Sequence, residues 1–148
     1  VFTTLHANDA PGAFMRLSEM SIEPFLTSTT VIGVIAQRLV RRVCTACREI
    51  YVPDTTVARY LGLPDHMECY KSAGCENCGF TGYKGRVGVY EVLTMNDTIR
   101  HLVAEGRETQ VIRAAAIAGG MKSLKEYCVT LLQEGTTSVD EVLRTVAI

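Results

Sequence analysis

The sequence contains none of the short motifs that mark a complete catalytic site. It has no phosphate-binding loop of the form G-x-x-x-x-G-K-[S/T], no H-E-x-x-H motif, no G-x-S-x-G motif and no dinucleotide-binding glycine pattern. Its most glycine-rich stretch, residues 82–88, has the wrong spacing for a phosphate-binding loop and precedes an expected strand instead of a helix. On its own, the chain therefore shows no complete catalytic constellation.

Strong charge of either sign and long apolar runs are missing as well. The 148 residues carry a formal net charge of -1, with 21% charged and 47% hydrophobic residues, which is an ordinary balance for a globular domain. This composition gives no support for binding to nucleic acid or to an acidic membrane surface. No apolar run approaches the length of a membrane span, and no secretory signal opens the chain. Because six cysteines without such a signal indicate a reducing compartment, we expect the cytoplasm.

Four of the six cysteines form two C-x-x-C pairs, Cys44 with Cys47 and Cys75 with Cys78. Two tight turns that each supply two thiolates are typical of a tetrahedral Zn²⁺ site. Fe²⁺ in an S₄ site would fit the same spacing, although zinc is the commoner occupant. Four cysteines leave no open position for water, so the pattern predicts a structural metal. Two redox dithiols or a pair of disulfides are the alternative interpretation.

The two remaining cysteines have different surroundings in the sequence. Cys128 lies on the apolar face of an expected helix, which predicts a core position. Cys69 precedes the second C-x-x-C pair, and it could be a bystander near the metal or exchange with one of its ligands.

The first residues predict a buried β-strand over residues 1–5. A chain that begins inside a strand is expected to belong to something longer. A polar turn follows, then a helix that ends near Ser21 and a second helix over residues 25–32, which is the layout of an α/β sheet edge where ligands bind. His6 lies in this turn, where phosphate-sensing residues are found, but position alone favours a capping or core histidine.

Two further strands, over residues 35–43 and 85–93, flank the cysteine segment and predict a hairpin whose tip carries a metal subdomain. The segment between the cysteine pairs includes a short helix near residues 56–61 and too little apolar material for a core of its own, so the metal should stabilise it. Of Arg38, Arg41 and Arg42, we expect one to face a nucleotide or a subunit interface and the others to be solvated. From Asn96 onward four helices are expected, and Ser123-x-x-Glu126 and Ser138-x-x-Glu141 are capping boxes for the last two.

Several runs, in this order, resemble one known family. They are T-L-H-A-N-D-A-P-G-A at 4–13, M-S-I-E-P-F-L at 20–26, G-V-I-A-Q-R-L-V-R-R-V-C at 33–44 and T-G-Y-K-G-R-V-G-V-Y-E-V-L at 81–93. With the two C-x-x-C pairs, they resemble the C-terminal half of the traffic ATPases, the hexameric motors of type II secretion and type IV pilus assembly. The resemblance covers nearly the whole chain.

The resemblance implies a fold class, α/β, in which the chain is the C-terminal half of a RecA-like P-loop ATPase domain. It implies part of the ATPase core at 1–43, an inserted tetracysteine zinc subdomain at 44–82, and a returning strand with a C-terminal helical subdomain at 83–148. The phosphate-binding loop and the acidic Walker B segment are then expected upstream of Val1, with ATP and Mg²⁺ bound by the full-length protein. The isolated chain should be inactive.

The resemblance also implies roles for single residues. His6 matches the family's His box, which makes it a candidate catalytic residue near the γ-phosphate or the catalytic carboxylate. Arg86 matches a position that approaches the nucleotide base, where a guanidinium can stack on a purine. The four cysteines match the family's zinc motif, which pilus-retraction relatives lack.

The implied partners are the neighbouring subunits of a homo-hexamer and a polytopic platform protein of the inner membrane, with the motor peripheral at that membrane on its cytoplasmic side. The alternative is a non-enzymatic zinc-binding module that binds a protein or nucleic acid. A nucleic-acid-binding zinc ribbon should carry a basic stripe, whereas residues 44–78 mix both signs of charge.

Overall fold

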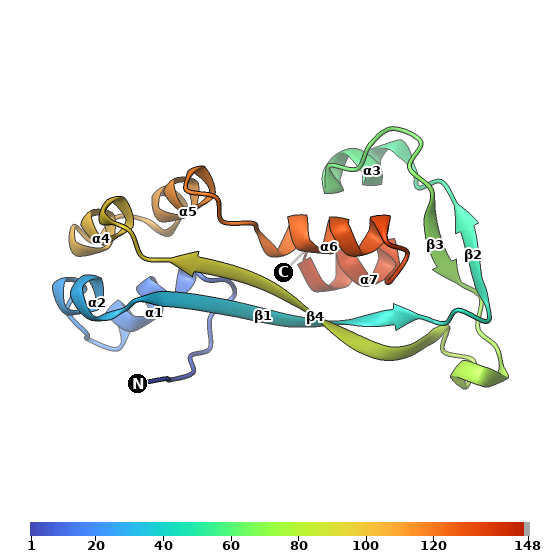
Figure 1. Ribbon diagram of the computed structural model, residues 1–148, viewed down its shortest axis with the longest axis horizontal. Helices are drawn as coiled ribbons and strands as arrows, with labels where there is room; N and C mark the ends of the chain where they lie inside the picture. Colours follow the sequence, from blue (N-terminus) through green and yellow to red (C-terminus); the bar gives the residue numbers. More distant parts are fainter. Residues whose placement is uncertain (147–148) are drawn as a thin grey trace. The chain divides into compact units, whose positions relative to one another are not determined.

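The computed structural model describes residues 1–146 as a mixed α/β structure (Figure 1). Two long strands, β1 (Gly33–Val43) and β4 (Tyr83–Thr94), pair with each other, and β2 (Arg48–Tyr51) and β3 (Cys69–Ser72) form a second, antiparallel pair. The α-helices are α1 (Gly12–Glu19), α2 (Pro24–Thr30), α3 (Thr55–Leu61), α4 (Asp97–Ala104), α5 (Thr109–Ala118), α6 (Leu124–Gln133) and α7 (Val139–Val146). The 3-10 turn η1 (Glu76–Cys78) begins directly after Cys75 and ends at Cys78.

The pairing of β1 with β4 confirms the expected hairpin around the cysteine segment. Beyond one end of the pair, the Met95 N–H donates to the Ile32 carbonyl over 3.2 Å. Beyond the other end, the Cys44 N–H donates to the Gly82 carbonyl over 2.9 Å. The chain between these strands forms β2, α3, β3 and η1.

The chain groups into two compact units, each built from separate stretches. Unit 1 combines residues 1–37 with residues 90–123, and unit 2 combines residues 38–89 with the chain from Leu124 onward. The three domains implied by the resemblance, 1–43, 44–82 and 83–148, are continuous in sequence, whereas these two units are defined by contacts within the chain. The three-domain division therefore stays a prediction.

The predicted strand at residues 1–5 is wrong. These residues have no regular secondary structure, and Val1 and Phe2 are fully exposed. A strand is stabilised by backbone hydrogen bonds to a neighbouring strand. Within residues 1–146 no strand pairs with this segment, so apolar composition alone does not make it one.

Unit 1 contains α1, α2, α4 and α5 around one hydrophobic core. All four helices are confirmed close to their predicted bounds, and the predicted cap Asn96 accepts a hydrogen bond from the Ile99 N–H at 2.9 Å. The buried core residues share an inward position on these helices and on the adjoining loops and strand; they are Ala10, Phe14, Leu93, Met95, Ile99, Val103, Ile112, Ala116 and Met121. This core fixes the start of α1 relative to α5.

Unit 2 places the cysteine segment and the last two helices around a second core. Its buried members come from β1, α3, β3, β4, α6, α7 and the loop after α3; they are Val40, Leu61, Leu63, Cys69, Val89, Cys128, Leu131, Leu132, Val139 and Val142. The structure thus agrees that the cysteine segment has no core of its own, and it adds that α6 and α7 supply the missing apolar partner.

The second predicted capping box forms only in part. The Ser138 hydroxyl accepts from the Glu141 N–H at 3.2 Å, as expected. The Glu141 carboxylate instead accepts from the Arg41 N–H at 2.9 Å, so it joins α7 to β1. Across residues 1–146, none of the helices has both the length and the apolar character needed to cross a bilayer.

Candidate functional site

The four predicted metal ligands come together in unit 2. Cys44 follows β1, Cys47 precedes β2, Cys75 precedes η1 and Cys78 ends it. Their Sγ atoms all lie within 4.8 Å of one another. The Cys44–Cys75 and Cys47–Cys78 pairs are each 3.9 Å apart, and Cys75–Cys78 is 3.8 Å. One group of four sulfur atoms is therefore formed from two turns that are distant in the sequence.

These distances fit a tetrahedral metal and not disulfides. A Zn–S bond of about 2.3 Å places the sulfur atoms of a tetrahedron about 3.8 Å apart. A disulfide would need an S–S distance of about 2 Å, and all six cysteines are free thiols. The cluster thus fits zinc binding, and the disulfide alternative is wrong.

Backbone N–H groups surround Cys78 in a way that favours its thiolate. The N–H groups of Cys75 and Gly82 each donate to Cys78 Sγ over 3.2 Å. The Cys75 hydrogen bond is the largest cause that lowers the pKa of Cys78 to about 6. For Cys47, burial is the main cause that raises the pKa to about 12, and the neighbouring cysteines add to it. Without a cation, Cys78 thus ionises readily while Cys47 stays protonated, and a bound metal ion would be needed for all four cysteines to be thiolates together.

Polar side chains extend the cluster outward. The Asn77 amide N–H group lies 3.9 Å from Cys44 Sγ, and the Lys84 ammonium donates to Asn77 Oδ1 at 2.9 Å. A tetrathiolate zinc centre has a net negative charge, so a nearby ammonium partly balances it. The cysteines excluded from the cluster, Cys69 and Cys128, are fully buried in the core of unit 2, which confirms the core prediction for Cys128.

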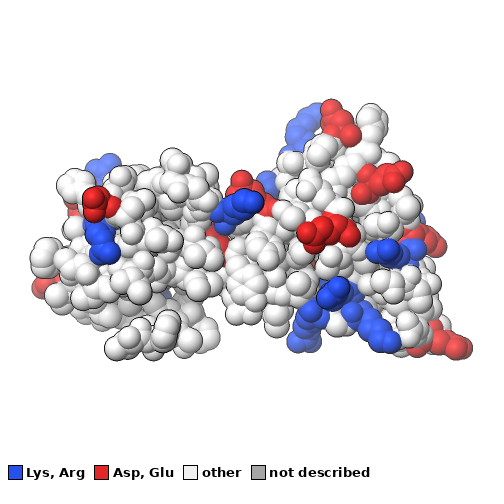
Figure 2. All heavy atoms as spheres, viewed as in Figure 1, with Lys and Arg blue, Asp and Glu red and all other residues white. Residues whose placement is uncertain are grey.

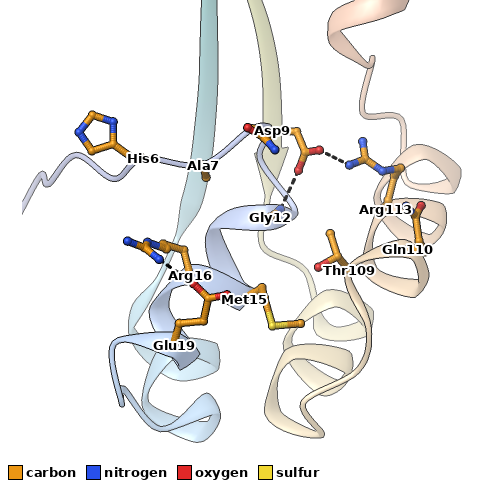
Figure 3. Close-up of a pocket in the computed structure, with 11 residues that line it drawn as sticks. His6, Ala7, Asp9, Gly12, Met15, Arg16, Glu19, Thr109, Gln110 and Arg113 are labelled. Carbon is orange, nitrogen blue, oxygen red and sulfur yellow. Dashed lines mark hydrogen bonds and ion pairs between the residues drawn. The ribbon is translucent and has the colours of Figure 1, made fainter. Parts of the chain in front are cut away.

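His6 lies in unit 1, on the loop before α1. Its side chain is exposed, and it lines an open cavity of about 390 Å³ together with side chains of α1 and α5 (Figure 3). Asp9 closes the base of this loop: its Oδ1 accepts from the Gly12 N–H at 2.8 Å, and its Oδ2 pairs with Arg113. His6 therefore remains available to a ligand, while the loop that carries it is anchored.

Arg86 lies on β4 in unit 2 and is exposed. Arg41, one of the three arginines on β1, contacts other residues of unit 2. Its guanidinium pairs with the buried Glu141 at 2.8 Å and lies 4.0 Å from the centre of the Tyr83 ring. Arg41 is thus a structural residue of unit 2.

The structure contains two networks of charged side chains that the sequence did not predict. One joins Arg41 to Glu141, and the other joins Asp9, Glu91 and Arg113. A signal existed for Glu91, because every second residue of β4 from Val87 onward faces inward and Glu91 occupies one of these positions. A charged residue at an inward position requires a buried partner.

Comparison with known proteins gives a match along nearly the whole chain. The family model described as "Type II/IV secretion system protein" matches residues 1–144. The "Type IV pilus assembly ATPase PilB" of Thermus thermophilus is 45% identical over 147 residues, covering 97% of this chain and 16% of that protein.

Two proteins from secretion systems are similar to a comparable degree. "Type II secretion system protein HxcR" of Pseudomonas aeruginosa is 41% identical over 144 residues, with 97% of this chain and 28% of the relative covered. "Type II secretion system protein E" of Dickeya dadantii is 40% identical over 144 residues, with 97% and 29% covered. The chain thus spans less than a third of the length of each of these relatives.

Proposed function

Because this chain belongs to the type II/IV secretion system protein family, we propose that it is the C-terminal part of a motor ATPase that powers type IV pilus assembly or type II protein secretion. The observation that carries the proposal is the family match over residues 1–144, together with 45% identity to a protein named as a pilus assembly ATPase. The similarity to relatives of both machines leaves the choice between them open.

In this proposal the chain completes a RecA-like ATPase domain whose phosphate-binding loop lies upstream. Residues 1–43 belong to the ATPase core, residues 44–82 form the zinc subdomain, and residues 83–148 contribute a returning strand and a helical subdomain. ATP and Mg²⁺ are bound by the full-length protein. The isolated chain lacks the phosphate-binding loop and should not hydrolyse ATP.

Two residues of this chain act on the nucleotide in this proposal. The His6 imidazole donates a hydrogen bond toward the γ-phosphate region or the catalytic carboxylate, and so distinguishes ATP from ADP. The Arg86 guanidinium stacks on the base. Their exposure supports both roles, since each side chain is available to a ligand.

The metal in this proposal is a structural Zn²⁺ held by Cys44, Cys47, Cys75 and Cys78. The sulfur distances of 3.8 and 3.9 Å support this assignment. Zinc supplies no chemistry to ATP hydrolysis here; it holds the two cysteine turns together.

The partners in this proposal are the other subunits of a homo-hexamer and a platform protein of the inner membrane, with the motor peripheral to that membrane on the cytoplasmic side. Nucleic acid is not a partner. Figure 2 shows acidic and basic side chains interspersed on the face that it draws.

In this proposal the zinc subdomain couples ATP turnover to the platform protein, and a double variant tests this. We expect Cys75→Ser with Cys78→Ser in the full-length protein to reduce secretion or piliation. A variant that keeps full ATPase activity together with full secretion or piliation would remove the coupling role.

The coding sequence immediately upstream of Val1 tests the assignment as a whole. We expect, in frame, a phosphate-binding loop followed by an acidic Walker B strand. A start codon or unrelated sequence in that place would contradict the motor assignment and leave a zinc-bearing domain whose role lies in binding.

A further inference from the structure

We propose that Arg113 is a positioning residue for the loop that carries His6, acting through its ion pair with Asp9. This inference rests on the proposed function, in which His6 acts on the nucleotide. It adds to that function a residue of helix α5, Arg113, which lies 104 positions after Asp9 in the sequence.

The base of the His6 loop is held by charged groups at two points. The Ala10 N–H donates to Glu91 Oε1 over 2.8 Å, and both residues are buried. One residue earlier, Asp9 uses one carboxylate oxygen for the Gly12 N–H and the other for the Arg113 guanidinium. Figure 3 shows Asp9 between these two partners, with Arg113 reaching across from α5.

Arg113 also connects the two acidic residues. Its Nη1 lies 4.0 Å from Glu91 Oε2, while its Nη2 pairs with Asp9. One guanidinium thus faces both the Glu91 carboxylate, which accepts from the Ala10 N–H, and the Asp9 carboxylate, which accepts from the Gly12 N–H at the start of α1. Because a guanidinium presents fixed, planar donors, it constrains the orientation of both partners.

Arg113 is itself held by a rigid element. It lies on α5 beside Ile112, which is 3% exposed in the core of unit 1, and α5 packs against α1 and α4. The ion pair is partly shielded, since the side chains of Arg113 and Asp9 are only 25% and 22% exposed. The pair therefore differs from Arg16–Glu19 in the same cavity, in which both side chains are more than half exposed.

The consequence concerns where His6 points. His6 is exposed, and only the loop from Ala7 to Asp9 connects it to this anchored base. Without the Arg113–Asp9 pair, the loop loses one of its restraints, and the imidazole would occupy a wider range of positions. A displacement of about 1 Å in a positioning group can cost up to roughly a hundredfold in rate.

The test is a double-mutant cycle in the full-length protein that contains this chain, with ATP hydrolysis as the assay. We expect His6→Ala to lower kcat about a hundredfold and Arg113→Gln to lower it about tenfold, with KM for ATP changed less than about twofold. If Arg113 acts through His6, Arg113→Gln in the His6→Ala background should have no further effect.

Three further variants make the result specific. Asp9→Asn keeps an acceptor for the Gly12 N–H but removes the charge, and it should reproduce the Arg113→Gln defect. Arg113→Lys should restore part of kcat. His101→Gln, on α4 of the same unit and outside the His6 cavity, is the control and should leave kcat unchanged, because its partner Glu105 is exposed on the same helix.

The outcomes separate the inference from the function beneath it. If His6→Ala leaves kcat unchanged, the role proposed for His6 fails, and the positioning role fails with it. If His6→Ala lowers kcat but Arg113→Gln does not, or if the two effects multiply to about a thousandfold, only the positioning role is overturned.

Discussion

Gly82 is the position beside the cysteine cluster at which an added methyl group should lower stability and zinc affinity most. It lies in the left-handed region with φ of 79°, and an added Cβ would lie 2.3 Å from Ser72 Cβ. Its N–H donates to Cys78 Sγ and its carbonyl accepts from the Cys44 N–H. The backbone at Gly82 therefore touches both cysteine turns.

Gly62 provides the matched control for the cost of the backbone conformation. Its φ is 72°, and an added Cβ would meet nothing within 4 Å. We expect Gly62→Ala to lower the free energy of unfolding by about 1 kcal/mol from the left-handed conformation alone. Gly82→Ala adds the clash with Ser72, which costs about 1–3 kcal/mol, for a total of about 3 kcal/mol.

Denaturant unfolding of the zinc-loaded chain measures the loss of unfolding free energy. Competition with a chromophoric chelator measures the affinity for zinc. Since the clash displaces a donor to Cys78, Gly82→Ala should also weaken zinc binding about tenfold, while Gly62→Ala should not. Equal losses of stability in the two variants, or unchanged zinc affinity in Gly82→Ala, would refute this reasoning.

Three other predictions concern unit 2. Burial opposes ionisation of Glu141, but its hydrogen bonds to Arg144 and Arg41 outweigh this and lower its pKa from 4.5 to about 2; Glu141→Gln should therefore cost about 3 kcal/mol of unfolding free energy at pH 7. A lowered pKa stabilises the fold only while the carboxylate is ionised. The difference in unfolding free energy between the unmodified protein and Glu141→Gln, measured by denaturant unfolding, should therefore shrink as the pH falls from 4.5 toward 2. A difference that stays constant over this range would contradict the prediction. Zinc removal by a chelator should speed exchange of the Val43 and Cys44 amides, since Val43 N–H donates to the Thr136 carbonyl and Cys44 N–H to the Gly82 carbonyl beside the cysteine cluster; exchange in α4 and α5 is the internal control, and unchanged exchange at Val43 and Cys44 would argue against the link. Cys69→Ala and Cys128→Ala should each lower stability by about 1–2 kcal/mol and leave the zinc content unchanged, whereas loss of zinc in Cys69→Ala would restore the ligand-exchange alternative.

Local patterns in the sequence predicted most of what the structure contains. The helices follow from apolar periodicity and capping residues such as Asn96, and the metal cluster follows from the spacing within each C-x-x-C pair. These features depend on residues a few positions apart, so a single sequence carries them.

The features that the sequence did not predict depend on distant partners. Asp9 pairs with Arg113 across 104 positions, and Arg41 pairs with Glu141 across 100. Nothing in the residues near Asp9 specifies Arg113 as its partner. The wrong strand at residues 1–5 has the same cause, because a strand is defined by the neighbour with which it pairs.

We propose that this chain is the C-terminal part of a motor ATPase, so the full-length protein should hydrolyse ATP. ATP hydrolysis by the full-length protein, compared with its His6→Ala variant and with the isolated 148-residue chain, tests it most directly. We expect turnover by the full-length protein, a loss of about a hundredfold in the variant and no turnover by the isolated chain. Turnover by the isolated chain, or a full-length protein that does not hydrolyse ATP, would contradict it.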